Sequence, residues 1–175
     1  MEPRKSLGPI PKSILSTNVG NVMIAVYADT PSASALRAMG ESQRRFADRQ
    51  HGPFGFFSFC ATGVGLPDAE AREVIGEISR TLGPRAAAAA IVLPGTGFWY
   101  SAARSVIDAA TRLSSAKRAK QSIFDAIDPA SRWIATHVGA HSETSGLLAG
   151  AMRDLVVTSG LDERGTRVTP LRHSA

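Results

Sequence analysis

The chain has 175 residues, of which 43% are hydrophobic and 20% charged, with a formal net charge of +5. This balance excludes a disordered chain, and the length suits one domain that buries its own core. A single cysteine, Cys60, excludes an intrachain disulfide and lies in an apolar run, where we expect an inert buried thiol. We find neither a signal peptide nor the ~18 apolar residues of a membrane span, so we expect a cytoplasmic protein without membrane insertion.

The positive charge does not point to nucleic acid. Basic residues are spread along the chain, and their densest group lies at a predicted helix end: Arg112, Lys117, Arg118 and Lys120. Positive charge at that position suits the negative end of a helix dipole. With only two tyrosines and two tryptophans, the chain offers few rings on which bases could stack. We therefore expect no nucleic-acid partner.

The first elements predict a hairpin followed by a helix. Residues 1–11 are rich in proline and charge and indicate a flexible arm. Residues 12–18 and the β-branched segment 21–27 suggest two antiparallel strands with the bend at residues 18–21. The segment from Asp29 to Ser32 signals a helix start. Apolar residues then recur at helical spacing, together with a glutamine: Leu36, Met39, Gln43 and Phe46.

The aromatic segment 54–61 predicts a third strand, which is followed by a short loop at residues 62–65. A proline and Asp68 then mark the start of a second helix. The apolar face of that helix consists of Val74, Ile75, Ile78 and Leu82. The run 87–93 lacks polar alternation, which is typical of a strand covered on both faces. We expect it, with the turn 94–97 and a helix over 98–114, at the centre of a sheet.

The rest of the chain predicts one more strand and two more helices. Residues 121–124 suggest the last strand, and Asp128 begins a helix that carries Trp133, Ile134, His137 and Val138. The order is then β-β-α-β-α-β-α-β-α over residues 12–138, an α/β domain with mostly parallel central strands. Residues 139–175 add a C-terminal helix and a polar tail. The apolar face of this helix must be buried, on its own domain or on a partner.

This order of elements resembles the STAS domain, the fold of anti-sigma-factor antagonists. The resemblance rests on the hairpin 14–27, the strand 54–60 leading to the helix 68–82, and the strand 87–93 with its turn 94–97. A glycine turn that ends in Gly-Phe and a helix with the sequence Ala-Ala-Arg-Ser also recur in bacterial STAS-like proteins. In this chain these are Gly97-Phe98 and the segment from Ala102 to Ser105. The resemblance implies a mixed sheet and a role in signal transduction. A doubly wound, flavodoxin-like fold remains the alternative, because one sequence does not give strand order.

In partner-switching members of that family, a serine or threonine after an aspartate is phosphorylated where the helix after the third strand begins. Here Thr62 is the only hydroxyl residue of the loop, and Asp68 is the only acid between Thr62 and the helix start. A phosphate at a helix amino terminus would add a charge of ~−1.5 to −2. Because Asp68 already places negative charge in that first turn, we predict a fixed surface and not a phospho-switch.

The turn before the 98–114 helix is the other candidate site. Backbone N–H groups of Gly95, Thr96 and Gly97 could hold an anion at a helix N-terminus, although the turn has no P-loop lysine. Trp99, Tyr100 and Arg104 follow and are residue types enriched at interfaces. His137 and His141 are four residues apart, but no third ligand is evident, so we expect no metal.

The sequence thus favours a non-enzymatic regulatory or protein-interaction module that binds a partner or self-associates. The alternative is a small domain that binds an anionic ligand or nucleotide at the turn from Gly95 to Gly97. No residue set argues for an enzyme or a resident cofactor. The candidate binding residues are Thr62, Asp68, Gly95, Thr96, Gly97, Trp99, Tyr100 and Arg104.

Overall fold

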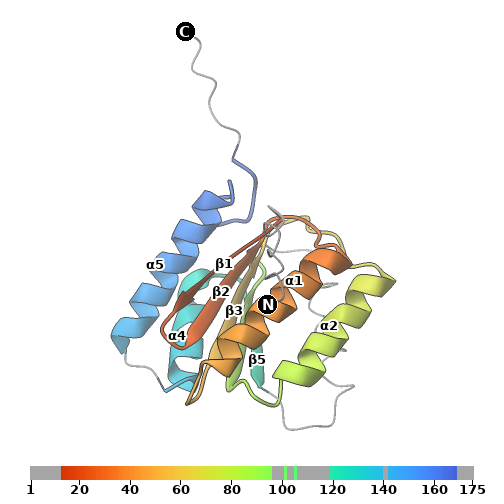
Figure 1. The fold of residues 1–175 in the computed structure, drawn as a ribbon. Coiled ribbons are helices and arrows are strands. Elements are labelled where there is room, and N and C mark those ends of the chain that lie inside the picture. The colour runs from red at the N-terminus through yellow and green to blue at the C-terminus, as the bar shows by residue number, and fades with distance from the viewer. Residues whose placement is uncertain (1–12, 96–100, 102–104, 106–118, 140–141, 169–175) are drawn as a thin grey trace, which may run out of the picture.

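The computed structural model describes residues 13–95, 101, 105, 119–139 and 142–168 (Figure 1). These residues form a mixed α/β fold. Its strands are β1 Ile14–Val19, β2 Val22–Tyr27, β3 Gly55–Cys60, β4 Ala88–Val92 and β5 Lys120–Phe124. The helices with assigned bounds are α1 Ala33–Asp48, α2 Ala69–Leu82, α4 Ile127–His137 and α5 Ser142–Thr158. The helix predicted over residues 98–114 lies outside the described residues, apart from Ser101 and Ser105, which are both helical.

The five strands lie side by side in chain order, β1-β2-β3-β4-β5. β1 and β2 are antiparallel, and each later strand is parallel to the one before it. The predicted hairpin is confirmed, but the strands extend further than expected, because Val19 still pairs with Val22. Gly20, at φ 56°, makes the tight turn. This sheet differs from the doubly wound order, in which the chain reverses its direction of travel across the sheet.

The strand at residues 88–92 is not the central strand. β3 occupies the middle of the sheet, and β4 lies between it and the edge strand β5. The error has a plain cause: an apolar run shows that a strand is buried on both faces, but β3 and β4 both meet that condition. Position within a sheet depends on pairing partners that are distant in the sequence.

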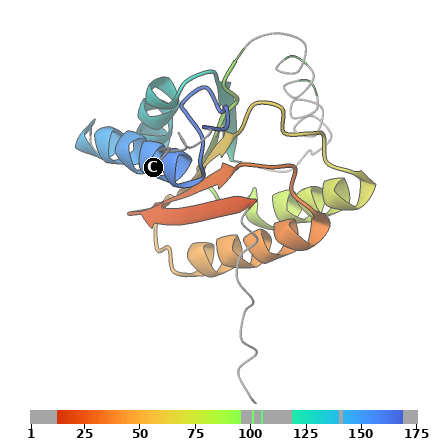
Figure 2. The same cartoon turned by 90° about the horizontal axis from the view of Figure 1, so that it is seen from above.

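The helices form two layers, one on each face of the sheet (Figure 2). α1 and α2 cover one face, and α4 and α5 cover the other. The side chains of β2 alternate between these two faces of the sheet. Val22, Ile24 and Val26 belong to the core under α4 and α5, whereas Met23 and Ala25 belong to the core under α1. Burial on both faces explains why β2 reads as a continuous apolar run.

The α1–α2 layer is packed closely. A Cβ atom built on Gly40 of α1 would lie 2.8 Å from Cγ1 of Ile78 on α2, so glycine allows the two helices to approach. Phe46 of α1 packs edge-to-face on Phe54, with ring centroids 5.8 Å apart. α1 begins where the sequence predicts, because the Ser32 side chain caps it by accepting a hydrogen bond from Ala35 N at 3.2 Å.

The C-terminal helix packs on its own domain. Leu148, Met152 and Val156 are at most 1% exposed and share a core with β2, β3 and α4. On its surface, Arg153 pairs with Asp128 of α4 at 2.8 Å and with Glu163 at 2.7 Å. These two hydrogen-bonded carboxylates raise the pKa of Arg153. α5 therefore completes the second half of the core.

Candidate functional site

The loops that follow β2, β3 and β4 meet at one edge of the sheet, because these strands are parallel. Polar contacts join the loops there. Thr30, after β2, accepts a hydrogen bond from Gly65 N at 2.6 Å through its hydroxyl oxygen. Thr62, after β3, lies beside Pro94, which follows β4. We call this region the carboxyl edge and define it by Asp29, Thr30 and residues 61–68, 94–95 and 161–168.

Thr62 holds the end of the chain on the carboxyl edge. Its backbone N–H donates to Gly165 O at 2.9 Å, and its hydroxyl donates to Arg164 O at 2.5 Å. The carbonyl oxygen of Pro94 is farther from the Thr62 hydroxyl oxygen, at 3.4 Å. Because a hydroxyl has one proton, it donates to the nearer carbonyl, that of Arg164. Thr62 is therefore a link between the β3–α2 loop and residues 161–168, which we call the C-terminal loop.

The C-terminal loop has its own internal structure. The Asp162 carboxylate accepts hydrogen bonds from Arg164 N at 3.0 Å and Thr166 N at 2.8 Å, which closes a turn. Leu161 and Arg167 form a β-bridge at its base. Arg167 then reaches Asp29 at 2.5 Å, and this hydrogen bond raises the pKa of Arg167. A segment expected to be only a polar tail thus carries an ordered part of the carboxyl edge.

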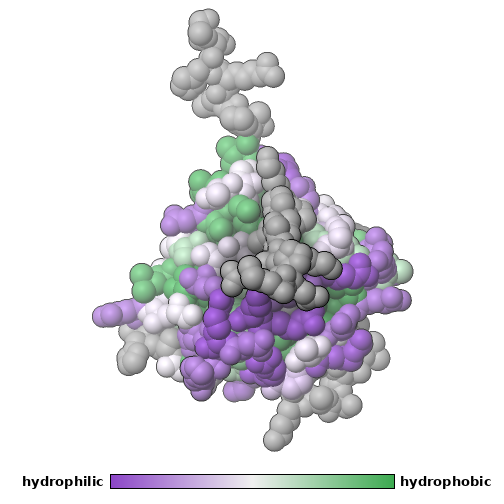
Figure 3. Space-filling model, viewed as in Figure 1, coloured by the Kyte–Doolittle hydropathy of each residue, from purple (hydrophilic) through white to green (hydrophobic). Residues whose placement is uncertain are grey.

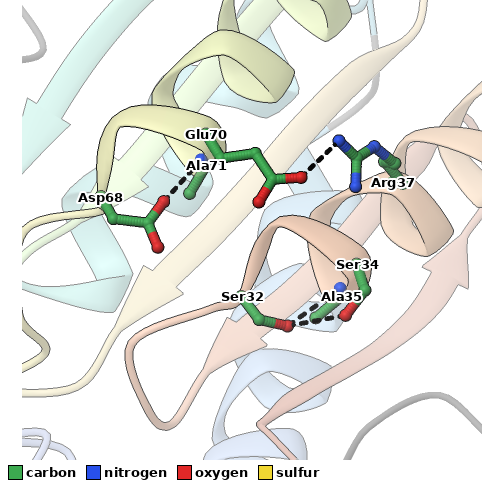
Figure 4. A network of polar contacts seen from close by, with 7 residues as sticks. All are labelled: Ser32, Ser34, Ala35, Arg37, Asp68, Glu70 and Ala71. Atoms are coloured by element: carbon green, nitrogen blue, oxygen red, sulfur yellow. Dashed lines mark hydrogen bonds and ion pairs between the residues drawn. The ribbon is translucent and has the colours of Figure 1, made fainter.

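Asp68 is the N-cap of α2, so the helix begins slightly later than the sequence predicts, which placed Asp68 inside the first turn. Its carboxylate accepts a hydrogen bond from Ala71 N at 2.8 Å. Figure 4 shows the α2 start beside the α1 start, where Ser32 plays the same part. Arg37 of α1 and Glu70 of α2 join the two helices at 2.8 Å. The carboxyl edge therefore carries the negative charge of Asp68 without modification. This carboxylate binds the first turn of its own helix, α2.

Replacing Asp68 by alanine is expected to lower the free energy of unfolding by about 1 kcal/mol, because the first turn of α2 loses its cap. Asp68→Asn keeps an acceptor oxygen and should stay within a few tenths of a kcal/mol of the unchanged protein. Urea unfolding followed by circular dichroism measures both. Equal losses in the two variants would show that charge, and not capping, is what Asp68 contributes.

Gly95 is the only described residue of the predicted anion-binding turn. Its φ of 103° requires glycine, and a Cβ atom there would lie 4.0 Å from the Thr62 hydroxyl oxygen. Gly95 and Thr62 are thus brought together. The other members of the predicted site lie outside the described residues: Thr96, Gly97, Trp99, Tyr100 and Arg104. Anion binding at this turn stays a prediction.

Two large apolar side chains are exposed at the carboxyl edge, and sequence reasoning missed both. Leu66 is 53% exposed and Val168 is 57% exposed. Each directly follows a residue that binds the Asp29–Thr30 segment, since Gly65 contacts Thr30 and Arg167 contacts Asp29. The two loops that carry them are therefore both held to the Asp29–Thr30 segment. No periodic pattern marks a residue in a loop, so only the folded arrangement identifies this pair.

Cys60 lies at the end of β3, opposite Tyr27 of β2. Burial raises the pKa of its thiol from the ordinary 9.0 to about 12. Burial also raises the pKa of Tyr27, and Cys60 adds a smaller effect of the same sign. At neutral pH both groups are uncharged, so the half-buried Cys60 has the character of an inert thiol and not of a nucleophile.

We expect Cys60 to react with iodoacetamide at pH 8 roughly 1,000-fold more slowly in the folded protein than in urea, because the thiolate is the nucleophile. The unfolded chain releases the thiol proton near pH 9, whereas the folded chain keeps it until about pH 12. The unfolding free energy should therefore fall as pH rises through that range. Mass spectrometry of the alkylated protein measures the rate, and equal rates in both states would contradict the prediction.

The predicted histidine pair does not assemble a site in the described residues. His137 stacks on Trp133, with ring centroids 4.1 Å apart, and its Nδ1 lies 2.8 Å from the Trp133 carbonyl oxygen. His141 lies outside the described residues. Within the described ranges, no group of three His, Cys, Asp or Glu side chains is placed to hold a metal ion.

Comparisons with protein-family models, with curated proteins and with solved structures found no match to this chain. Among the helices that the structure describes, none has both the length and the hydropathy needed to cross a membrane. The candidate site therefore stands on its own geometry: a carboxyl edge held together by Thr62, with Leu66 and Val168 exposed in the two loops that bind Asp29 and Thr30.

Proposed function

We propose that the chain is a non-enzymatic regulatory module of STAS-like fold that binds a protein partner through its carboxyl edge. The observation that carries the proposal is the exposure of Leu66 and Val168 in the two loops that bind the Asp29–Thr30 segment. Apolar side chains next to an arginine are typical of the centre of a protein interface. The STAS resemblance supplies the expectation of a signalling role.

The way the carboxyl edge is held supports binding by a surface formed in advance. The C-terminal loop is fixed by the Thr62 hydroxyl and by the Arg153–Glu163 ion pair. The β3–α2 loop is fixed by Gly65 and Thr30. A partner that docks on such a surface does not have to order the loops, which lowers the entropic cost of association.

The contacts of Thr62 also support a fixed surface over a phosphorylated one. A phosphate on this side chain would remove the proton that the hydroxyl donates to the Arg164 carbonyl. Phosphate oxygens are acceptors only near neutral pH, so they would face that carbonyl oxygen without a hydrogen bond. Modification would release the C-terminal loop. We therefore propose that the unmodified residue is the binding form.

The test is affinity capture of the full chain from its native cell, with partners quantified by mass spectrometry. Leu66→Asp should reduce recovery of the partner at least about tenfold, because a charge replaces an apolar contact. Leu147→Asp is the matched control: Leu147 is 65% exposed but lies near the start of α5, at the opposite end of the helix from the C-terminal loop. Circular dichroism confirms that both variants fold.

Two results would overturn the proposal. One is equal recovery of every partner by the two variants. The other is stoichiometric phosphate on Thr62 in the native protein, together with loss of the partner from Thr62→Ala and its retention by Thr62→Glu, which would make the surface a phospho-switch.

A further inference from the structure

Among the described strands, β1 is the edge strand on the hairpin side of the sheet. In an antiparallel pair of strands, hydrogen-bonded residue pairs alternate with pairs that are not hydrogen-bonded. Ser13 and Ala28 form a hydrogen-bonded pair, because Ala28 N donates to Ser13 O. Leu15 and Thr17, two and four residues later, therefore also exchange hydrogen bonds with β2. The backbone groups of Ile14, Ser16 and Asn18 consequently point away from β2. Within the described residues, no hydrogen bond reaches the outward groups of Ser16 and Asn18.

This edge lacks the features that normally prevent strands from pairing. Proteins protect edge strands with charged side chains, proline or a bulge. The six residues of β1 are Ile, Leu, Ser, Thr, Asn and Val, with no charge and no proline. The pairing with β2 is continuous from Ile14 to Val19, so no bulge twists the strand away. The edge is therefore free of bulges and charges over its six residues.

The flank of α5 above this edge is apolar along Leu147, Ala151 and Leu155, with the charges of Glu143 and Asp154 beside it. α5 packs over β1 and β2. Arg153 binds Asp128 of α4, so that side of α5 faces α4. Leu147, Ala151 and Leu155 recur every four residues on the other side, and Leu147 is 65% exposed. Figure 3 shows that hydrophobic residues gather on the side of the molecule where α5 lies.

We propose that the β1 edge and this α5 flank bind a second copy of the chain. The two β1 strands pair antiparallel about a two-fold axis with Ser16 opposite Ser16, which also places Ile14 opposite Asn18. This register is the one that uses all three outward-facing residues of each strand. It joins two five-stranded sheets into one continuous sheet.

The helix layer fits the same symmetry. The axis stands perpendicular to the joined sheet, so α5 of one copy and α5 of the other lie on the same face. With strands ~4.8 Å apart and α5 above β1 and β2, the two α5 axes come to about 10 Å, a normal distance for packed helices. A bare extended peptide would satisfy the strand edge but leave the Leu147 flank uncovered. A second copy covers both.

The proposal is independent of the carboxyl edge, so its failure leaves the proposed function as it was. We expect analytical ultracentrifugation of the full chain to show a dimer. Ser16→Lys and Ser16→Glu should each raise the dimer dissociation constant at least about 100-fold, because like charges then meet at the axis. An equimolar mixture of the two variants should restore the dimer, since the charges are then opposite.

Val157→Lys is the control, because Val157 is exposed on α5 but is not on the flank that faces the second copy. This variant should remain dimeric. The proposal is overturned if the unchanged chain is monomeric at high micromolar concentration. In that case the β1 edge is covered by residues 1–12 of the same chain or by another protein. The proposal is equally overturned if both Ser16 variants, folded by circular dichroism, still form the dimer, or if their mixture stays monomeric.

Discussion

Replacing Leu148 by alanine is expected to lower the free energy of unfolding by about 3 kcal/mol, which is within the range for leucine removed from a close-packed core. Leu148 is fully buried between α5 and the sheet, in the core that also holds Ile24, Phe57 and Ile134. The loss combines the transfer free energy of the removed methyl groups with the cavity that they leave. Urea unfolding measures it.

Val157→Ala on the same helix is the control, because Val157 is 70% exposed. Its unfolding free energy should change by no more than about 0.5 kcal/mol. A small loss for Leu148→Ala, or an unfolding transition in which α5 melts before the sheet, would show that the helix is a separate unit and not part of the core.

Gly165→Ala is expected to cost about 3 kcal/mol and to release the C-terminal loop. A Cβ atom on Gly165 would lie 2.7 Å from Thr62 N and 3.1 Å from Ala61 Cα. Both are backbone atoms of the segment that leaves β3, so the clash is not relieved by a side-chain movement. The φ of 72° adds about 1 kcal/mol of strain for any residue with a Cβ atom.

Gly160→Ala separates these two effects. Gly160 also has a φ of 72°, but nothing lies within 4 Å of a Cβ atom placed there. It should therefore lose only the strain, about 1 kcal/mol. Hydrogen exchange at residues 161–168 should rise in Gly165→Ala beyond its rise in Gly160→Ala. Equal stability and equal exchange in the two variants would contradict the close contact at Thr62.

Local patterns in the sequence predicted the elements of this fold well. The hairpin, the helix starts near Ser32 and Asp68 and the amphipathic α5 all follow from signals within a few residues of each other. Such signals act through backbone geometry and apolar spacing, which a single sequence displays. The mixed α/β class followed from the order of these elements.

The arrangement of the carboxyl edge was beyond local reasoning. The Thr62 hydroxyl binds the carbonyl of a residue 102 positions later, and no local pattern specifies such a partner. The run from Asp162 to Gly165 indicates a turn by its residue types, but not the place where that turn docks. The exposure of Leu66 and Val168 likewise depends on what the rest of the chain leaves uncovered.

The sequential order of the strands has a consequence for synthesis on the ribosome. The hairpin, α1, β3, α2 and β4 precede residue 93, and with them the α1–α2 side of the sheet can close. The opposite side presents Val22, Ile24 and Phe57, which stay bare until α4 and α5 have been translated. For that interval the nascent chain carries a wide apolar surface, of the kind that chaperones bind. A chain that ends before residue 148 should therefore aggregate, even when the α1–α2 side of its sheet is correctly folded.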